Sequence, residues 1–106
     1  MKVLDSGESI ESFIKNNKIA MLYFSSEGCS VCGVLLPKIE ELLKKYPKIE
    51  IAKIEVDELQ SAVGKYSIFT LHCILLLIEG KEIIREARFI SVVDLEEKIK
   101  RFYLLI

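Results

Sequence analysis

Apolar and polar positions along the chain follow two different spacings, and together they predict strands alternating with helices. Short apolar or alternating stretches bounded by turn residues indicate strands, and apolar residues three or four positions apart indicate helices. We expect strands at residues 2–5, 19–24, 49–56, 73–78 and 82–89. We expect helices at residues 9–16, 31–46, 59–66 and 92–106.

This order of elements is typical of an α/β domain with a central mixed β-sheet and helices on both faces. The continuous apolar stretches at 19–24 and 73–78 fit strands that are covered on both sides. Glu79-Gly80 predicts a hairpin turn, which adds an antiparallel edge to the sheet. We expect one domain spanning residues 1–106.

Several single residues predict where helices begin and end. Pro37 should kink the long helix near its first turns, and Pro47 should close it. Ser91 should cap the last helix, and Asp57, at a strand end, is interpreted as a helix cap. Four aromatic residues have the spacing of core positions: Tyr46, Phe89, Phe102 and Tyr103.

Composition and charge exclude several classes of protein. The net charge of −1 argues against a general nucleic-acid-binding face. No apolar run approaches the ~20 residues of a membrane span, and no secretory signal is visible at the N-terminus. Three cysteines without such a signal argue against a secreted disulfide scaffold, so we expect a cytoplasmic protein.

One motif carries clear chemistry: Cys29-Ser30-Val31-Cys32, placed between a predicted strand and a predicted helix. With Cys29 at the N-cap and Cys32 one turn later, the two sulfurs can form a disulfide. The free N–H groups and the positive end of the helix dipole favour the thiolate of Cys29. Cys29 is therefore the expected nucleophile and Cys32 the resolving cysteine; the alternative is a pair of inert buried cysteines.

From residue 9 to the C-terminus the chain resembles the thioredoxin family. The stretch YFSSEGCSVC resembles the family's strand and active-site segment, and Pro37 matches its helix-kinking proline. Residues 52–68 and 73–83 resemble its third strand with the following helix and its final hairpin. The resemblance implies the thioredoxin fold and dithiol–disulfide exchange at Cys29 and Cys32.

The chain departs from the family at several site positions. Gly28 stands where thioredoxins usually have an aromatic residue, and Ser30-Val31 replaces their Gly-Pro. Tyr23 stands in the place of a buried acid that assists proton transfer at the second cysteine. Lys53 matches the lysine near that acid, and here it would either hydrogen-bond the Tyr23 hydroxyl or extend outward.

His72 stands where the family has a cis-proline. A cis bond before a non-proline residue costs about 2.5–4 kcal/mol, so we expect Leu71–His72 to be trans. Three roles for His72 follow: it modulates the thiols, it binds a metal with Cys29 and Cys32, or it is an ordinary loop histidine. Cys73 would complete a Cys3His set, but strand alternation places it on the opposite face, where it is interpreted as a small buried hydrophobe.

These residues lead to a first hypothesis, a thiol–disulfide oxidoreductase acting on protein substrates. A rim around Ser30, Val31 and Leu71 would contact an extended segment of the substrate. We expect no cofactor, since nothing here binds a flavin or nicotinamide, and a separate reductase would supply electrons. We expect a monomer, with a weak dimer as the alternative, and no nucleic-acid or membrane partner.

Two further hypotheses use the same fold. One is a metal or iron–sulfur module that employs Cys29, Cys32 and His72 as ligands. The other is an interaction domain without turnover, which rests on the loss of the acid at Tyr23 and of the aromatic residue at Gly28.

Overall fold

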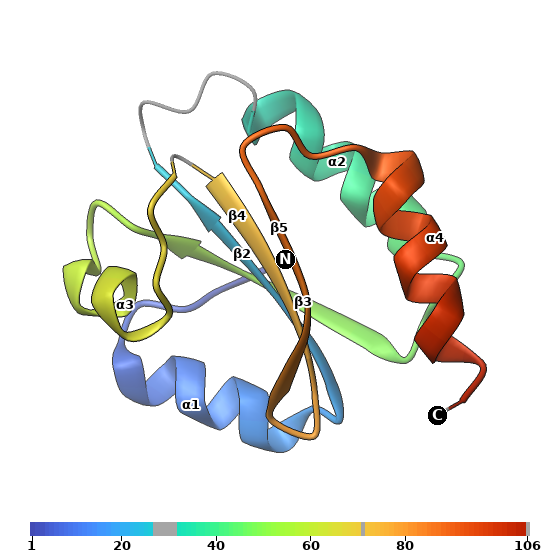
Figure 1. Ribbon diagram of the computed structural model, residues 1–106. Coiled ribbons are helices and arrows are strands. Elements are labelled where there is room, and N and C mark those ends of the chain that lie inside the picture. The colour runs from blue at the N-terminus through green and yellow to red at the C-terminus, as the bar shows by residue number, and fades with distance from the viewer. Residues whose placement is uncertain (27–31, 71, 106) are drawn as a thin grey trace.

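The computed structural model describes residues 1–26, 32–70 and 72–105, and its elements follow the predicted order (Figure 1). The strands are β1 (Lys2–Val3), β2 (Ile19–Ser25), β3 (Ile49–Glu55), β4 (His72–Ile78) and β5 (Lys81–Ala87). The helices are α1 (Gly7–Asn16), α2 (Cys32–Leu43), α3 (Gln60–Lys65) and α4 (Val92–Tyr103).

The strands form a single mixed sheet in the order β1-β3-β2-β4-β5. Strand β3 is parallel to β1 and β2, whereas β4 is antiparallel to both β2 and β5. The central strand β2 ends at Ser25, which is in register with Glu55 of β3 on one side and His72 of β4 on the other. The C-terminal end of β2, the start of β4 and the end of β3 therefore meet at one edge of the sheet.

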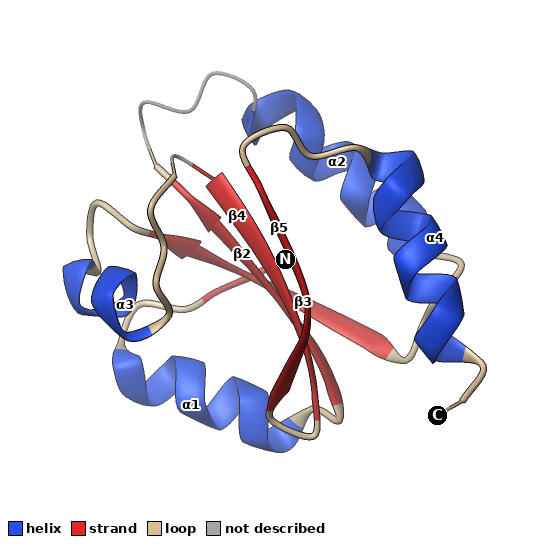
Figure 2. Ribbon diagram, in the orientation of Figure 1, coloured by secondary structure: helices blue, strands red, loops and turns tan. Residues whose placement is uncertain are grey.

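Helices cover both faces of the sheet, α1 and α3 on one and α2 and α4 on the other (Figure 2). Each face has its own apolar core. The core on the α1 side includes Ile10 and Leu22, and the core on the α2 side includes Ile39 and Ile99. The predicted fold class, a mixed sheet between two layers of helices, is confirmed.

Two local predictions are confirmed by the backbone. Glu79 and Gly80 have φ values of 52° and 82°, as a two-residue hairpin turn of the right twist requires. The Ser91 hydroxyl accepts a hydrogen bond from the Asp94 N–H at 3.2 Å and so caps α4. Pro37 lies inside α2, where it has no N–H to donate to the Gly33 carbonyl.

Several predicted helix ends and caps were wrong, and α1 begins at Gly7, two residues before its predicted start. Helix α2 ends at Leu43 and not at Pro47, because the chain enters a turn before it reaches the proline. The N-cap position of α3 is Leu59, so Asp57 does not occupy it. Helix α4 ends at Tyr103, and Ile106 lies outside the described residues.

The aromatic residues that were expected in the core divide into two groups. Tyr46 is buried, and Phe102 and Tyr103 are partly buried against the α2 side of the sheet. Phe89 is 95% exposed, so its assignment to the core was wrong. It follows the last residue of β5 by two positions and lies in the loop that leads to α4, where strand alternation no longer applies.

Candidate active site

The predicted cysteine motif begins four residues after β2 ends and leads into α2. Cys32 is the first residue of α2, whereas Cys29, Ser30, Val31 and Leu71 lie outside the described residues. The placement of the Cys29 sulfur at the helix N-terminus and the geometry of the Leu71–His72 bond stay predictions. What the structure describes is the edge of the sheet from which this segment departs.

His72 lies at that edge, as the first residue of β4. It is 7% exposed, and its Nε2 contacts the backbone carbonyl of Arg88 in the β5–α4 loop. A carbonyl oxygen can only accept, so Nε2 carries the proton in this hydrogen bond. The Thr70 hydroxyl donates to the carbonyl of His72. Of the three roles given for His72, that of an ordinary loop histidine was therefore wrong, and any role at sulfur or metal would fall to Nδ1.

Tyr23 lies on the α2 face of β2. The side chain is fully buried, and its hydroxyl has no hydrogen-bond partner among the described residues. Burial raises the pKa of the Tyr23 phenol above its ordinary value. The group therefore stays protonated at neutral pH, as a hydrogen-bond donor and not as a carboxylate base.

Lys53 is in register with Tyr23, but its ammonium contacts a different group. Its Nζ lies 2.7 Å from Oε1 of Glu55, two residues further along β3. Of the two alternatives for Lys53, the hydrogen bond to the Tyr23 hydroxyl was therefore wrong, because that hydroxyl has no partner among the described residues. Residues two apart on a strand share a face, and this signal in the sequence could have identified Glu55 as the partner.

Glu55 is a site residue that the sequence analysis missed. It is in register with Ser25 at the end of β2, and 26% of its side chain is exposed. The Lys53–Glu55 ion pair thus places a carboxylate and an ammonium, rather than a lone acid, at the edge from which the cysteine segment departs.

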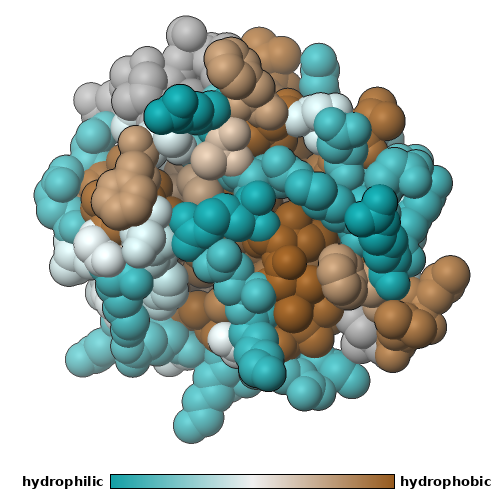
Figure 3. Space-filling view, in the orientation of Figure 1, coloured by the Kyte–Doolittle hydropathy of each residue, from teal (hydrophilic) through white to brown (hydrophobic). Residues whose placement is uncertain are grey.

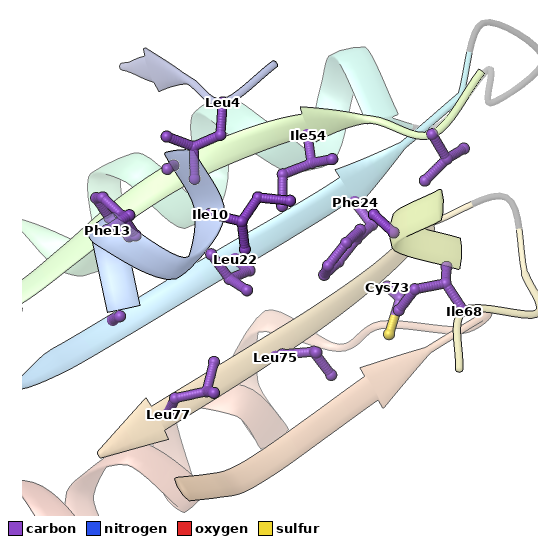
Figure 4. Close-up of a cluster of buried hydrophobic side chains, with 14 residues drawn as sticks. Leu4, Ile10, Phe13, Leu22, Phe24, Ile54, Ile68, Cys73, Leu75 and Leu77 are labelled. Carbon is purple, nitrogen blue, oxygen red and sulfur yellow. The ribbon is translucent and has the colours of Figure 1, made fainter. Parts of the chain in front are cut away.

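Cys73 lies on the opposite face from His72, as strand alternation predicted. It is 1% exposed and packs beside Ile68 and Phe24 in the core on the α1 side (Figure 4). Burial raises the pKa of its thiol, although Arg85 Nη1 lies 4.0 Å from the sulfur. The interpretation of Cys73 as a small buried hydrophobe is confirmed.

Metal binding finds no support in the described residues. Within 1–26, 32–70 and 72–105, no three His, Cys, Asp or Glu side chains come together as a metal site would require. Cys73 is directed into the core, and Nε2 of His72 is taken by the Arg88 carbonyl. The set of Cys29, Cys32 and His72 includes a residue beyond the described part of the chain and stays a prediction.

A groove of about 670 Å³ adjoins His72 on the α2 face. It lies between the first half of α2 and the β5–α4 loop, and both Arg88 and the exposed Phe89 line it. Neither Arg88 nor Phe89 was predicted from the sequence as a site residue. The pattern at 82–89 predicted a strand through Phe89, whereas β5 ends at Ala87 and leaves Arg88 and Phe89 in a loop.

Comparison with known proteins agrees with this architecture. The thioredoxin family model matches residues 2–101. A relative from Bacillus subtilis (strain 168), thioredoxin-like protein YdfQ, is 42% identical over 105 residues, which cover 99% of this chain and 94% of the relative. Thioredoxin H8 of Arabidopsis thaliana is 34% identical over 81% of this chain and 57% of its own length.

Solved structures give the same result. The X-ray structure of Fasciola hepatica thioredoxin superposes with a TM-score of 0.85 at 32% identity and covers 95% of this chain and 98% of its own. In the described part of the chain, no helix is long and apolar enough to cross a membrane. The sheet order, the two helical layers and these matches lead to one conclusion: this chain belongs to the thioredoxin family.

Proposed function

We propose that this protein is a thiol–disulfide oxidoreductase in which Cys29 is the nucleophile and Cys32 the resolving cysteine. Membership of the thioredoxin family implies thiol–disulfide exchange, and these two cysteines are the ones that match the family's motif. The observation that carries the proposal is the position of Cys32. It is the first residue of α2, the helix that follows the central strand β2 in the chain.

The reaction has two balanced steps. The Cys29 thiolate attacks one sulfur of a substrate disulfide, and the other substrate sulfur leaves as a thiolate. The Cys32 thiolate then attacks the Cys29 sulfur, which releases the second substrate sulfur and forms the Cys29–Cys32 disulfide. Two electrons pass to the substrate, and a separate reductase returns them to the protein. In this proposal residues 1–106 act as one domain, without a cofactor, in the reducing cytoplasm.

The residues around the cysteines have distinct roles in this proposal. His72 modulates the thiols from the start of β4, with Nε2 anchored to the Arg88 carbonyl. Tyr23 offers a buried hydrogen-bond donor where the family has an acid, and Lys53 is held by Glu55. Ser30, Val31 and Leu71 contact the substrate.

Insulin reduction by the full chain, with dithiothreitol as the electron source, tests the proposal. Wild type should accelerate precipitation of the insulin B chain, and Cys29→Ser should remove the acceleration. Cys32→Ser should accumulate a mixed disulfide with substrate. Cys73→Ala is the matched control, because it removes a sulfur that lies in the core on the other face, and it should keep turnover. Equal turnover by wild type and Cys29→Ser would contradict the proposal.

One observation favours a second candidate, an interaction domain that captures partners without turnover. The phenol of Tyr23 cannot act as the carboxylate that assists proton transfer at the second cysteine. This candidate predicts that wild type binds partners but leaves the insulin rate at the level of Cys29→Ser. Trapping with Cys32→Ser separates the two, because only the oxidoreductase yields disulfide-linked partners.

A further inference from the structure

The groove beside His72 has apolar walls that are open to solvent. Val34 of α2, Phe89 of the β5–α4 loop and Val93 of α4 line it, with exposed fractions of 61%, 95% and 71%. Figure 3 shows apolar side chains gathered at the top of the molecule, over the β5–α4 loop and the start of α2. Three large apolar side chains around one groove form a surface suited to binding an apolar group.

The charges that line this groove have one sign. Lys38 of α2 and Arg88 of the β5–α4 loop are both exposed and both line it, and no carboxylate does so among the described residues. The chain as a whole has a net charge of −1, so this local excess of positive charge is not a general property of the surface. A ligand with negative charge complements it.

The loop that presents Arg88 and Phe89 is held in an uncommon conformation. Arg88 has a φ of 62°, in the left-handed region that residues other than glycine rarely adopt. Its carbonyl accepts the hydrogen bond from His72, which is buried at the start of β4. In this conformation Phe89, two residues after the end of β5, is directed to solvent. The buried His72 and the loop that lines the groove are therefore joined by a hydrogen bond.

We propose that this groove selects extended substrate segments in which an acidic residue lies next to a bulky apolar residue near the target disulfide. The apolar side chain contacts Val34, Phe89 and Val93, and the carboxylate pairs with Arg88 and Lys38. This inference rests on the proposed disulfide exchange at Cys29 and names its substrate class. His72 connects the groove with the cysteine segment, since it lies at the edge of the sheet from which that segment departs and also lines the groove.

Three synthetic peptides test the inference. Each carries a cysteine in a disulfide with thionitrobenzoate, preceded by leucine, and they differ only in having Glu, Gln or Lys before that leucine. The Cys29 thiolate of the full-length Cys32→Ser protein attacks the peptide sulfur, and the coloured thionitrobenzoate thiolate leaves. Its release therefore reports the first exchange step alone.

We expect the second-order rate constant for the Glu peptide to exceed that for the Lys peptide by about fivefold at low salt, with the Gln peptide between them. High salt should reduce the ratio towards one, because both cations are exposed. Arg88→Gly removes the charge and tolerates the positive φ, and it should at least halve the ratio. Arg101→Gln, at the far end of α4, removes the same charge and should keep the ratio.

The outcomes separate this inference from the proposed function. Peptides that all react at one rate, or a ratio that Arg88→Gly leaves unchanged, would overturn the substrate class while leaving disulfide exchange in place. Equal losses with Arg88→Gly and Arg101→Gln would also overturn it, since net charge would then explain the preference. Absence of thionitrobenzoate release with all three peptides would overturn the proposed function and this inference together.

Discussion

The buried hydroxyl of Tyr23 leads to a stability prediction with a definite sign. The side chain is fully buried, and its oxygen has no hydrogen-bond partner in the described part of the chain. A buried polar group without a partner costs about 1–3 kcal/mol. Tyr23→Phe keeps the ring and removes only this oxygen, so the free energy of unfolding should rise by about 1 kcal/mol. In a domain of this size, that rise corresponds to an increase in Tm of roughly 4–8 °C.

Urea unfolding followed by circular dichroism, in the oxidised and the reduced protein, measures this change. The slope of the unfolding free energy against urea concentration (the m-value) should stay the same, so that the shift in midpoint reports stability alone. Tyr46→Phe is the matched control, because the Tyr46 hydroxyl donates to Glu96 Oε2 at 2.8 Å. The same chemical change there should lower the free energy of unfolding by about 1 kcal/mol. A loss of stability with Tyr23→Phe in either redox state would refute the reasoning and reveal a partner for its hydroxyl in that state.

Three further predictions concern other parts of the fold. Burial and the bond to Glu96 raise the pKa of Tyr46 from 10.0 to about 12. The raised pKa means that the protonated phenol of Tyr46 stabilises the folded state below pH 10.0, and this contribution is lost as the pH rises towards about 12. Between these pH values the urea midpoint should therefore fall more steeply in wild type than in Tyr46→Phe. His72→Leu removes the donor to the Arg88 carbonyl and should lower the unfolding free energy by about 1–3 kcal/mol, which an unchanged urea midpoint would contradict. Gly80→Ala, at a φ of 82°, should cost about 1 kcal/mol in thermal unfolding, and an unchanged Tm would argue against strain at this turn.

The fold could be predicted from the sequence because local and global signals agree in it. The apolar stretch at 19–24 forms β2, which is covered on both faces. The Glu79-Gly80 turn has the positive φ values that a two-residue hairpin turn needs. The end of α2 could not be predicted as well. Tyr46 is buried although it lies beyond the helix, so its apolar spacing continued the helical pattern past the point where the helix ends.

The site was less predictable than the fold, because its side chains have competing partners. Lys53 had two plausible partners on one face of the sheet, and the carboxylate of Glu55 binds an ammonium more strongly than a phenol does. Phe89 has a large apolar side chain of the kind usually found in a core. The positive φ of Arg88, however, turns the chain before Phe89 can continue the strand. The carbonyl of Arg88 also accepts a hydrogen bond from His72, sixteen positions earlier, and no local sequence pattern contains that contact.

The position of Cys73 gives the protein an internal reporter of its own opening. Its sulfur lies in the core between the sheet and the α1 layer, and its thiol is held in the unreactive protonated form. A thiol-labelling reagent therefore reaches it only when the packing around Cys73 on the α1 side of the sheet opens. With Cys29 and Cys32 replaced by serine, the labelling rate of this one sulfur measures how often the α1 side of the domain opens, without any added probe.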